Sequence, residues 1–129
     1  MEASERYSAL ANTVFEWIEI PGNSALTSTI TLTELLARPY QVADDTMVRT
    51  YHALLTAYPN LSWVPPDLAI ADLAAQFRAK HRMRTPDSLQ AATAIHATAT
   101  GFVTNDPVFK RVEAFEALVL DDVIPKPQR

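Results

Sequence analysis

Apolar residues recur at helical spacing in several long segments of the chain. The first segment runs from Ala3 to about Ile20 and ends at a turn that begins with Pro21. Further helices are predicted over Ala43–Tyr58, over Asp67–Lys80 and after Thr85. Thr85 is expected to be the N-cap of the last of these helices, with Pro86 as its first helical residue. The apolar faces of the first three helices are expected to comprise Tyr7, Leu10, Val14, Trp17 and Ile18, then Met47, Tyr51, Leu54 and Leu55, and then Leu68, Ala71, Leu73, Ala74 and Phe77.

Short segments rich in apolar and β-branched residues alternate with these helices. They predict strands at Ala25–Ile30, Leu61–Val64, Phe102–Val103 and Ala117–Leu120. A short helix opening at Thr31 and stopping before Pro39 follows the first strand, and a turn of helix follows Pro107. Strands that alternate with helices favour an α/β fold with a mostly parallel sheet between helical layers.

Composition narrows the class of protein. A length of 129 residues suits one domain with one core, and residues 124–129, with their prolines, predict a loose tail. The sequence has no cysteine, which excludes disulfides and thiolate metal sites and fits a cytoplasmic protein. No apolar run reaches membrane-spanning length. The formal net charge is −4 at pH 7, so any binding to nucleic acid must rest on a local basic patch.

Three carboxylates occupy comparable places in this pattern. Glu34 follows the first predicted strand and Asp106 follows the third, whereas Asp87 lies in the first turn of the helix that opens at Thr85. The carboxyl ends of parallel strands meet at one edge of a sheet, which is where such sheets bind ligands. We therefore expect the three carboxylates to face one shared crevice.

Each carboxylate also has a purely structural explanation. Glu34 could close a capping box with Thr31, Asp87 could complement a helix dipole, and Asp106 could cap the helical turn after it. Taken together, three acids without a lysine or arginine beside them in sequence would repel one another, and a hard divalent cation would relieve that repulsion. Mg²⁺ binds carboxylate oxygens and keeps several waters, which suits metal-assisted phosphodiester hydrolysis.

A basic stretch precedes the helix that carries Asp87. It holds four of the eleven lysines and arginines of the chain, together with a histidine: Arg78, Lys80, His81, Arg82 and Arg84. One interpretation is a solvated helix end whose cations complement the helix dipole. The other is a patch beside a metal site in which Arg82 and Arg84 hold substrate phosphates. The sequence leaves both interpretations open.

Three segments resemble motifs of the PIN domain family, and of VapC-type toxin ribonucleases of bacterial toxin–antitoxin pairs in particular. The segments are residues 30–36, 85–94 and 102–109, and the order and spacing match from about Ser4 to Val123. The resemblance implies a three-layer α/β/α fold and RNA cleavage that depends on Mg²⁺ or Mn²⁺. It implies catalytic metal ligands at Glu34, Asp87 and Asp106, with Thr104 as a supporting hydroxyl. It further implies a homodimer and an antitoxin partner that blocks the active site.

The start of the sequence departs from the pattern of the family. Family members begin with a central strand followed by an Asp-Thr or Asp-Ser motif, whereas this sequence enters within the first helix. We interpret the difference as truncation of a longer protein rather than degeneration, because the other three acids are present. The expectation is then a sheet of four strands with a gap between those at Ala25 and Phe102.

Three functions remain open at this point. The first is a metal-dependent endoribonuclease whose activity the truncated chain need not retain. The second is a non-catalytic PIN-like module that binds RNA or a protein. The third is a doubly wound domain of another kind, resembling a phosphate-binding regulator. The location of the three carboxylates in the fold bears on all of them.

Overall fold

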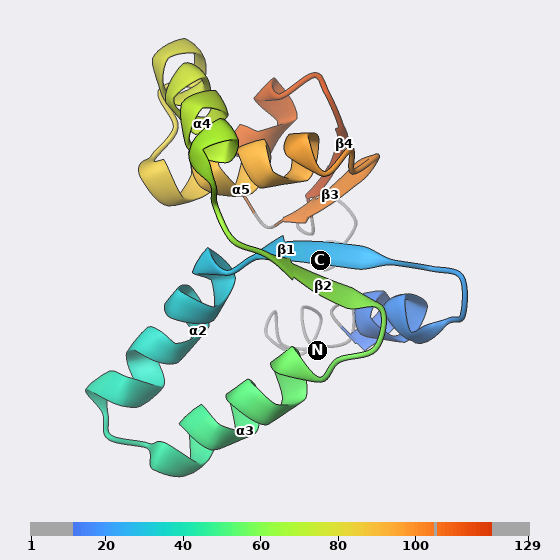
Figure 1. Ribbon diagram of the computed structural model, residues 1–129, viewed down its shortest axis with the longest axis vertical. Coiled ribbons are helices and arrows are strands. Elements are labelled where there is room, and N and C mark those ends of the chain that lie inside the picture. The colour runs from blue at the N-terminus through green and yellow to red at the C-terminus, as the bar shows by residue number, and fades with distance from the viewer. Residues whose placement is uncertain (1–11, 105, 120–129) are drawn as a thin grey trace, which may run out of the picture.

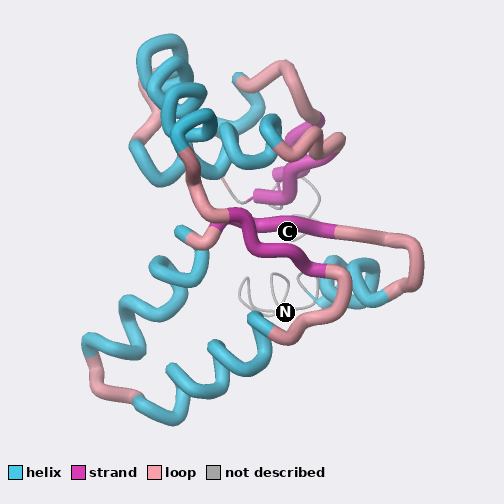
Figure 2. The backbone as a smooth tube through the Cα atoms, viewed as in Figure 1, coloured by secondary structure: helices cyan, strands magenta, loops and turns pink. Residues whose placement is uncertain are grey.

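Two parallel strand pairs form the centre of the structure. This computed structural model describes residues 12–104 and 106–119. The strands are β1 (Ala25–Ser28), β2 (Leu61–Val64), β3 (Gly101–Thr104) and β4 (Glu116–Val119). Each predicted strand is thus present, and parallel pairing of β1 with β2 and of β3 with β4 confirms the α/β class. Within the described residues the pairs remain two separate sheets, with no ladder between β1 and β3 (Figure 2).

Helices connect and flank these strands. Residues 12–19 are helical, so the first predicted helix lies only partly within the described part of the chain. The later elements are α2 (Ile30–Gln41), α3 (Asp45–Thr56), α4 (Leu68–His81), α5 (Thr85–His96) and the 3₁₀ turn η1 (Pro107–Arg111). In Figure 1, α2 and α3 form a hairpin extending from the β1–β2 pair, whereas α4 and α5 gather with β3 and β4. The tail predicted for 124–129 lies outside the described residues.

Helix boundaries differ from the prediction at α2 and α5. The predicted stop before Pro39 is wrong, because α2 continues to Gln41 with a buried Pro39 inside it. A proline near the end of a helix removes only one internal hydrogen bond, and its burial offsets part of that loss. At α5 the predicted cap is displaced by one residue, because Arg84 precedes the helix and Thr85 is its first residue.

The buried faces of α3 and α4 agree only in part with the predicted ones. Leu73, Ala74 and Phe77 of α4 lie in or against a core cluster as predicted, and Tyr51 and Leu55 of α3 are half-buried. Leu68 is 89% exposed, whereas Ile70, two positions later, is fully buried. Residues two positions apart on a helix point about 200° away from each other, so the burial of Ile70 places Leu68 on the solvent side. Trp17, also predicted to be in the core, is 52% exposed beside a buried Ile18. In α3 the buried residue is Val48, whereas the predicted Met47 and Leu54 are exposed.

The larger core cluster joins the end of the α4–α5 loop to η1 and β3. Its buried members are Met83, Ala91, Ala94, Phe109, Val112 and Phe115. Phe102 from β3 packs on this cluster, with its ring centroid 4.4 Å from that of Phe109 and 4.8 Å from that of Phe115. A second cluster of Ile70, Ala74 and Ala92 holds α4 on α5. These contacts fix the positions of the loop before α5 and of the turn after β3.

Candidate active site

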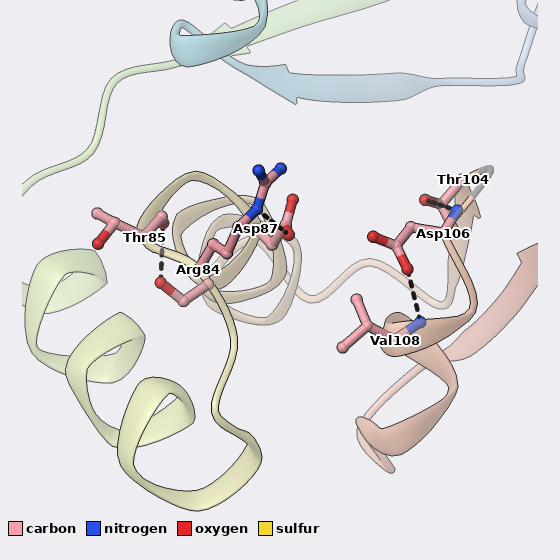
Figure 3. Close-up of polar contacts among 7 residues, drawn as sticks. Arg84, Thr85, Asp87, Thr104, Asp106 and Val108 are labelled. Carbon is pink, nitrogen blue, oxygen red and sulfur yellow. Dashed lines mark hydrogen bonds and ion pairs between the residues drawn. The ribbon is translucent and has the colours of Figure 1, made fainter.

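Asp87 lies in the first turn of α5 and forms an ion pair with the residue that precedes the helix. Figure 3 shows the Arg84 side chain beside the Asp87 carboxylate, and Nε of Arg84 is 3.5 Å from Oδ2 of Asp87. The side chain of Asp87 is 20% exposed and that of Arg84 is 80% exposed. No lysine or arginine is adjacent to Asp87 in sequence, but the fold brings Arg84 beside it. Since Arg84 is largely solvated, the pair contributes at most about 1 kcal/mol.

Asp106 begins the turn that follows β3. Its Oδ1 accepts a hydrogen bond from the backbone N–H of Val108 at 2.9 Å, which confirms its predicted role as a cap of η1. Its own backbone N–H donates to Thr104 Oγ1 at 3.1 Å. Thr104 therefore shapes the turn that presents Asp106. Figure 3 shows the Asp87 and Asp106 carboxylates on the side of α5 and η1 that faces β1.

Glu34 is an exposed residue of α2, one helical turn after Thr31. The predicted capping box between them is wrong, because α2 begins at Ile30 and Thr31 lies inside the helix. The hydroxyl of Thr31 is instead within 2.7 Å of Thr27 Oγ1, from β1. Among the described residues, no hydrogen bond or ion pair holds the Glu34 carboxylate, so its side chain is free to turn.

A side-chain hydrogen bond joins α5 to the start of α2. Gln90 Nε2 donates to Thr31 Oγ1 at 2.8 Å across 59 positions of sequence. Gln90 lies three residues after Asp87, and Thr31 lies three residues before Glu34. Residues three apart share one face of a helix, so each of these two carboxylates is one turn from the same hydrogen bond. Sequence reasoning missed this pair, although both residues lie inside the family-like motifs.

The chemistry and the spacing of these residues decide whether they can hold a metal ion. In the ranges 12–104 and 106–119, no group of three or more His, Cys, Asp or Glu side chains is arranged so that it could hold a metal ion. The donor atoms themselves are carboxylate oxygens, which Mg²⁺ and Mn²⁺ prefer. The chemistry of the set therefore fits such an ion, with Asp87 and Asp106 on neighbouring elements and Glu34 on a separate helix.

A hollow of about 560 Å³ lies elsewhere. It is lined by residues at the C-terminal end of α5 and around the start of β4, including Ile95, Thr98, Glu113 and Glu116. Asp87 is at the other end of α5, and Asp106 follows the opposite end of β3. The hollow is therefore separate from the candidate site. No helix in the described residues is both long and apolar enough to cross a membrane.

Comparisons with known proteins agree with this architecture. The chain matches the PIN domain family over residues 6–114. No curated protein matches it by sequence. A solved structure described as a toxin-antitoxin complex from Klebsiella pneumoniae is similar, with a TM-score of 0.60 and 17% sequence identity, over 78% of this chain and 75% of that chain. At that identity the likeness establishes the fold. The family match spans most of the sequence, and the chain therefore belongs to the PIN domain family.

Proposed function

We propose that this protein is a metal-dependent endoribonuclease of the VapC toxin type. Its catalytic metal ligands would be Glu34, Asp87 and Asp106, with Thr104 supporting the last of them. Membership of the PIN family supports nuclease chemistry. The observation that most supports this set of residues is the Gln90–Thr31 hydrogen bond of 2.8 Å, which ties the helix of Asp87 to the helix of Glu34.

The ion would be Mg²⁺ or Mn²⁺. When bound, it supplies charge stabilisation for hydrolysis of a phosphodiester. The chain itself supplies the orientation of the acids: Thr104 Oγ1 accepts a hydrogen bond from the backbone N–H of Asp106, and the first turn of α5 holds Asp87. Arg82 and Arg84 would hold substrate phosphates. Arg84 can leave Asp87 for a phosphate at small cost, because their exposed ion pair is weak.

The proposed partners are those expected of a VapC-type toxin. A cognate antitoxin would block the site, and the similar structure from Klebsiella pneumoniae, a toxin-antitoxin complex, supports this expectation. We also propose that the protein forms a homodimer and acts in the cytoplasm. The oligomeric state is measurable by light scattering on the purified chain, and an antitoxin is detectable by co-purification from the native host.

Cleavage of RNA by the purified chain tests the proposal. The parent should cut single-stranded RNA with Mn²⁺ or Mg²⁺ and stop when EDTA is added. Asp87→Asn and Asp106→Asn should each lower the rate at least about 100-fold, because a neutral amide is a poor ligand for a hard cation. Asparagine caps helices as well as aspartate does, so Asp106→Asn should keep the turn of η1.

The matched control is Asp72→Asn on α4, where the carboxylate accepts a hydrogen bond from Gln76 in an exposed position. It makes the same change of charge away from the site and should leave the rate unaltered. Cleavage that persists in EDTA, or that survives in both the Asp87 and Asp106 variants, would overturn the assignment.

One observation favours a second candidate function. Within the described residues, no group of acids and histidines is arranged to hold a metal ion, which suits a non-catalytic module that binds RNA or protein. Such a module would bind RNA without cutting it at any concentration of Mn²⁺. Binding and cleavage measured on the same preparation therefore separate the two candidates.

A further inference from the structure

Positive charge is concentrated on two segments of the fold. The part of the chain that the structure describes contains eight lysines and arginines. Six of them, all exposed, are Arg78, Lys80, Arg82, Arg84, Lys110 and Arg111. The other two, Arg38 and Arg49, lie on α2 and α3. The protein has a formal net charge of −4, so these two segments are locally basic in a protein that is acidic as a whole.

The fold joins the two basic segments into one surface. Arg111 Nη1, at the end of η1, donates to the backbone carbonyl of His81 at the end of α4, at 3.1 Å. Met83 is 3% exposed and belongs to the same core cluster as Phe109 and Val112. Because Met83 points inward, its neighbours Arg82 and Arg84 are left on the outside. We call these six cations the basic seam.

The basic seam leads to the candidate active site. Arg84 reaches Asp87, with 3.5 Å between Nε and Oδ2. Asp106 begins the turn that ends in Lys110 and Arg111. Each segment therefore carries cations at one end and a candidate metal ligand at the other. Glu113, two residues beyond Arg111, lines the separate hollow near the start of β4.

Arg82 lies at the end of α4 in the left-handed conformation, with φ 55° and ψ 34°. Glycine is the usual residue at such helix ends, because this conformation costs an L-residue about 1–2 kcal/mol. Ala43, Asn60 and Thr98 adopt it as well, so the conformation by itself assigns Arg82 no role. What Arg82 brings to the basic seam is an exposed charge.

We propose that the basic seam binds the phosphate backbone of RNA and leads the strand to Asp87 and Asp106. The inference rests on the proposed function, since the ligand is the substrate of that enzyme. The seam offers charge and hydrogen-bond donors, while the apolar residues beneath it, Met83, Phe109 and Val112, are buried. An interface with a protein normally needs an exposed apolar centre, whereas a phosphate backbone is bound by charge.

Binding measured without metal tests the seam independently of cleavage. The probe is a fluorescein-labelled single-stranded RNA of about 12 nucleotides, a length in the range that single-strand binding surfaces occupy. Anisotropy is recorded in EDTA over a series of salt concentrations. Lys80→Gln/Arg82→Gln should weaken binding roughly fivefold or more and reduce the slope of log K against log salt by about 1.4, at about 0.7 per lost contact.

The matched control is Arg38→Gln/Arg49→Gln, which removes the same charge from α2 and α3. It should keep the affinity and the salt slope of the parent. Thermal melting verifies that each variant is folded. If the double seam variant melts too low for the assay, Lys80→Gln alone should give about half of the change in slope.

The remaining outcomes are distinct. Parent-like binding and slope in the seam variant, or an equal loss in the control, would overturn the seam. Binding of polyglutamate but not of RNA, lost in the seam variant, would replace it with an acidic protein partner. Loss of cleavage in Asp87→Asn together with unchanged RNA binding by the seam variant would refute the seam alone. Normal cleavage in Asp87→Asn and Asp106→Asn, with binding lost in the seam variant, would refute only the metal-ligand assignment.

Discussion

The side-chain amide of Gln90 donates a hydrogen bond to the hydroxyl of Thr31, with 2.8 Å between Nε2 and Oγ1. Thr31 Oγ1 is in turn 2.7 Å from Thr27 Oγ1 on β1. The chain from Gln90 through Thr31 to Thr27 therefore connects α5, α2 and β1. In the described residues no strand ladder joins the two sheets, and this polar link holds α5 to β1 alongside the packing of Val64 from β2 on Ile70 and Ala92.

We expect the Gln90–Thr31 pair to act as a positioning pair for the two neighbouring carboxylates. Gln90→Leu should lower the free energy of unfolding by about 1 kcal/mol, because it leaves the partly buried hydroxyl without its donor. Thr31→Val should cost a similar amount. If the two residues act through their mutual hydrogen bond, the double variant should lose less free energy of unfolding than the two single variants lose together. The expected difference is about 0.5–1.5 kcal/mol.

Urea unfolding of the parent and the three variants measures this coupling, and RNA cleavage by the same proteins measures its consequence. The control is Gln76→Leu on α4, which removes an exposed hydrogen bond of 2.9 Å to Asp72. It should change stability by no more than about 0.5 kcal/mol and leave cleavage alone. Additive costs in the double variant would show that Gln90 and Thr31 do not depend on each other.

The sequence predicted those elements that depend only on residues close to them in the chain. The strand at Leu61–Val64 was predicted at its observed bounds, because two prolines follow a short β-rich run. The cap formed by Asp106 needs only the carboxylate and the backbone N–H of Val108 two residues later. The fold class and the identity of the family motifs were predictable for the same reason.

Features that depend on distant neighbours were not predictable. Thr31 has the spacing of a capping box, but bonds to Thr27 and Gln90 occupy its hydroxyl inside the helix. Leu68 is as apolar as Ile70, yet only the contacts of α4 with α5 decide which of them is buried. The ion pair of Arg84 with Asp87 likewise depends on where α5 begins. The sequence pattern placed the N-cap at Thr85, one residue later than the observed N-cap at Arg84.

Replacing Arg82 with glycine should raise stability and lower RNA affinity together. Glycine relieves a left-handed conformation that costs arginine about 1–2 kcal/mol, but it loses about 0.5–1 kcal/mol of unfolded-state entropy, so the net gain is about 0.5–1 kcal/mol. RNA affinity should fall because one cation leaves the basic seam. Thermal melting and anisotropy in EDTA measure the two effects.

Thr98→Gly is the matched control for Arg82→Gly. Thr98 is also left-handed, with φ 57°, and it lies near the hollow beside the end of α5 rather than on the basic seam. The Thr98→Gly variant should show a similar increase in the free energy of unfolding, without any change in RNA affinity. Equal RNA affinity in the parent and in Arg82→Gly would indicate that Arg82 serves no role in binding.

Tyr58 should titrate at a higher pH than an unperturbed tyrosine. Burial, the charge of Glu19 and a hydrogen bond to it, and then the charge of Glu16 raise the pKa of Tyr58 above its ordinary value of 10.0. The fold thus favours the neutral hydroxyl. Its stabilising contribution is complete below about pH 10, and it is lost as the pH rises through the higher pKa of the folded protein.

Phenolate absorbance measured against pH checks the titration of Tyr58. Tyr58→Phe should remove the titration step of Tyr58 and should flatten the loss of stability in alkaline solution. Glu19→Gln removes the largest charge contribution while keeping a hydrogen-bonding side chain, so it should move the step toward lower pH. A Tyr58 step at or below pH 10 in the folded protein would contradict the expected direction.

Divalent metal should stabilise the parent and lose that effect when Asp87 is neutralised. A ligand that binds only the folded state raises the free energy of unfolding by about 2.7 kcal/mol at a concentration of 100 times its Kd. With only three candidate ligands, we expect the effect to need millimolar rather than micromolar Mg²⁺ or Mn²⁺. Melting curves with Mn²⁺, and again after EDTA, should show a reversible rise in Tm for the parent and for Asp72→Asn, but none for Asp87→Asn. If Asp87→Asn is more stable than the parent and Mn²⁺ changes the Tm of neither protein, Asp87 is an acid whose charge no metal offsets rather than a metal ligand. That outcome would favour the non-catalytic binding module.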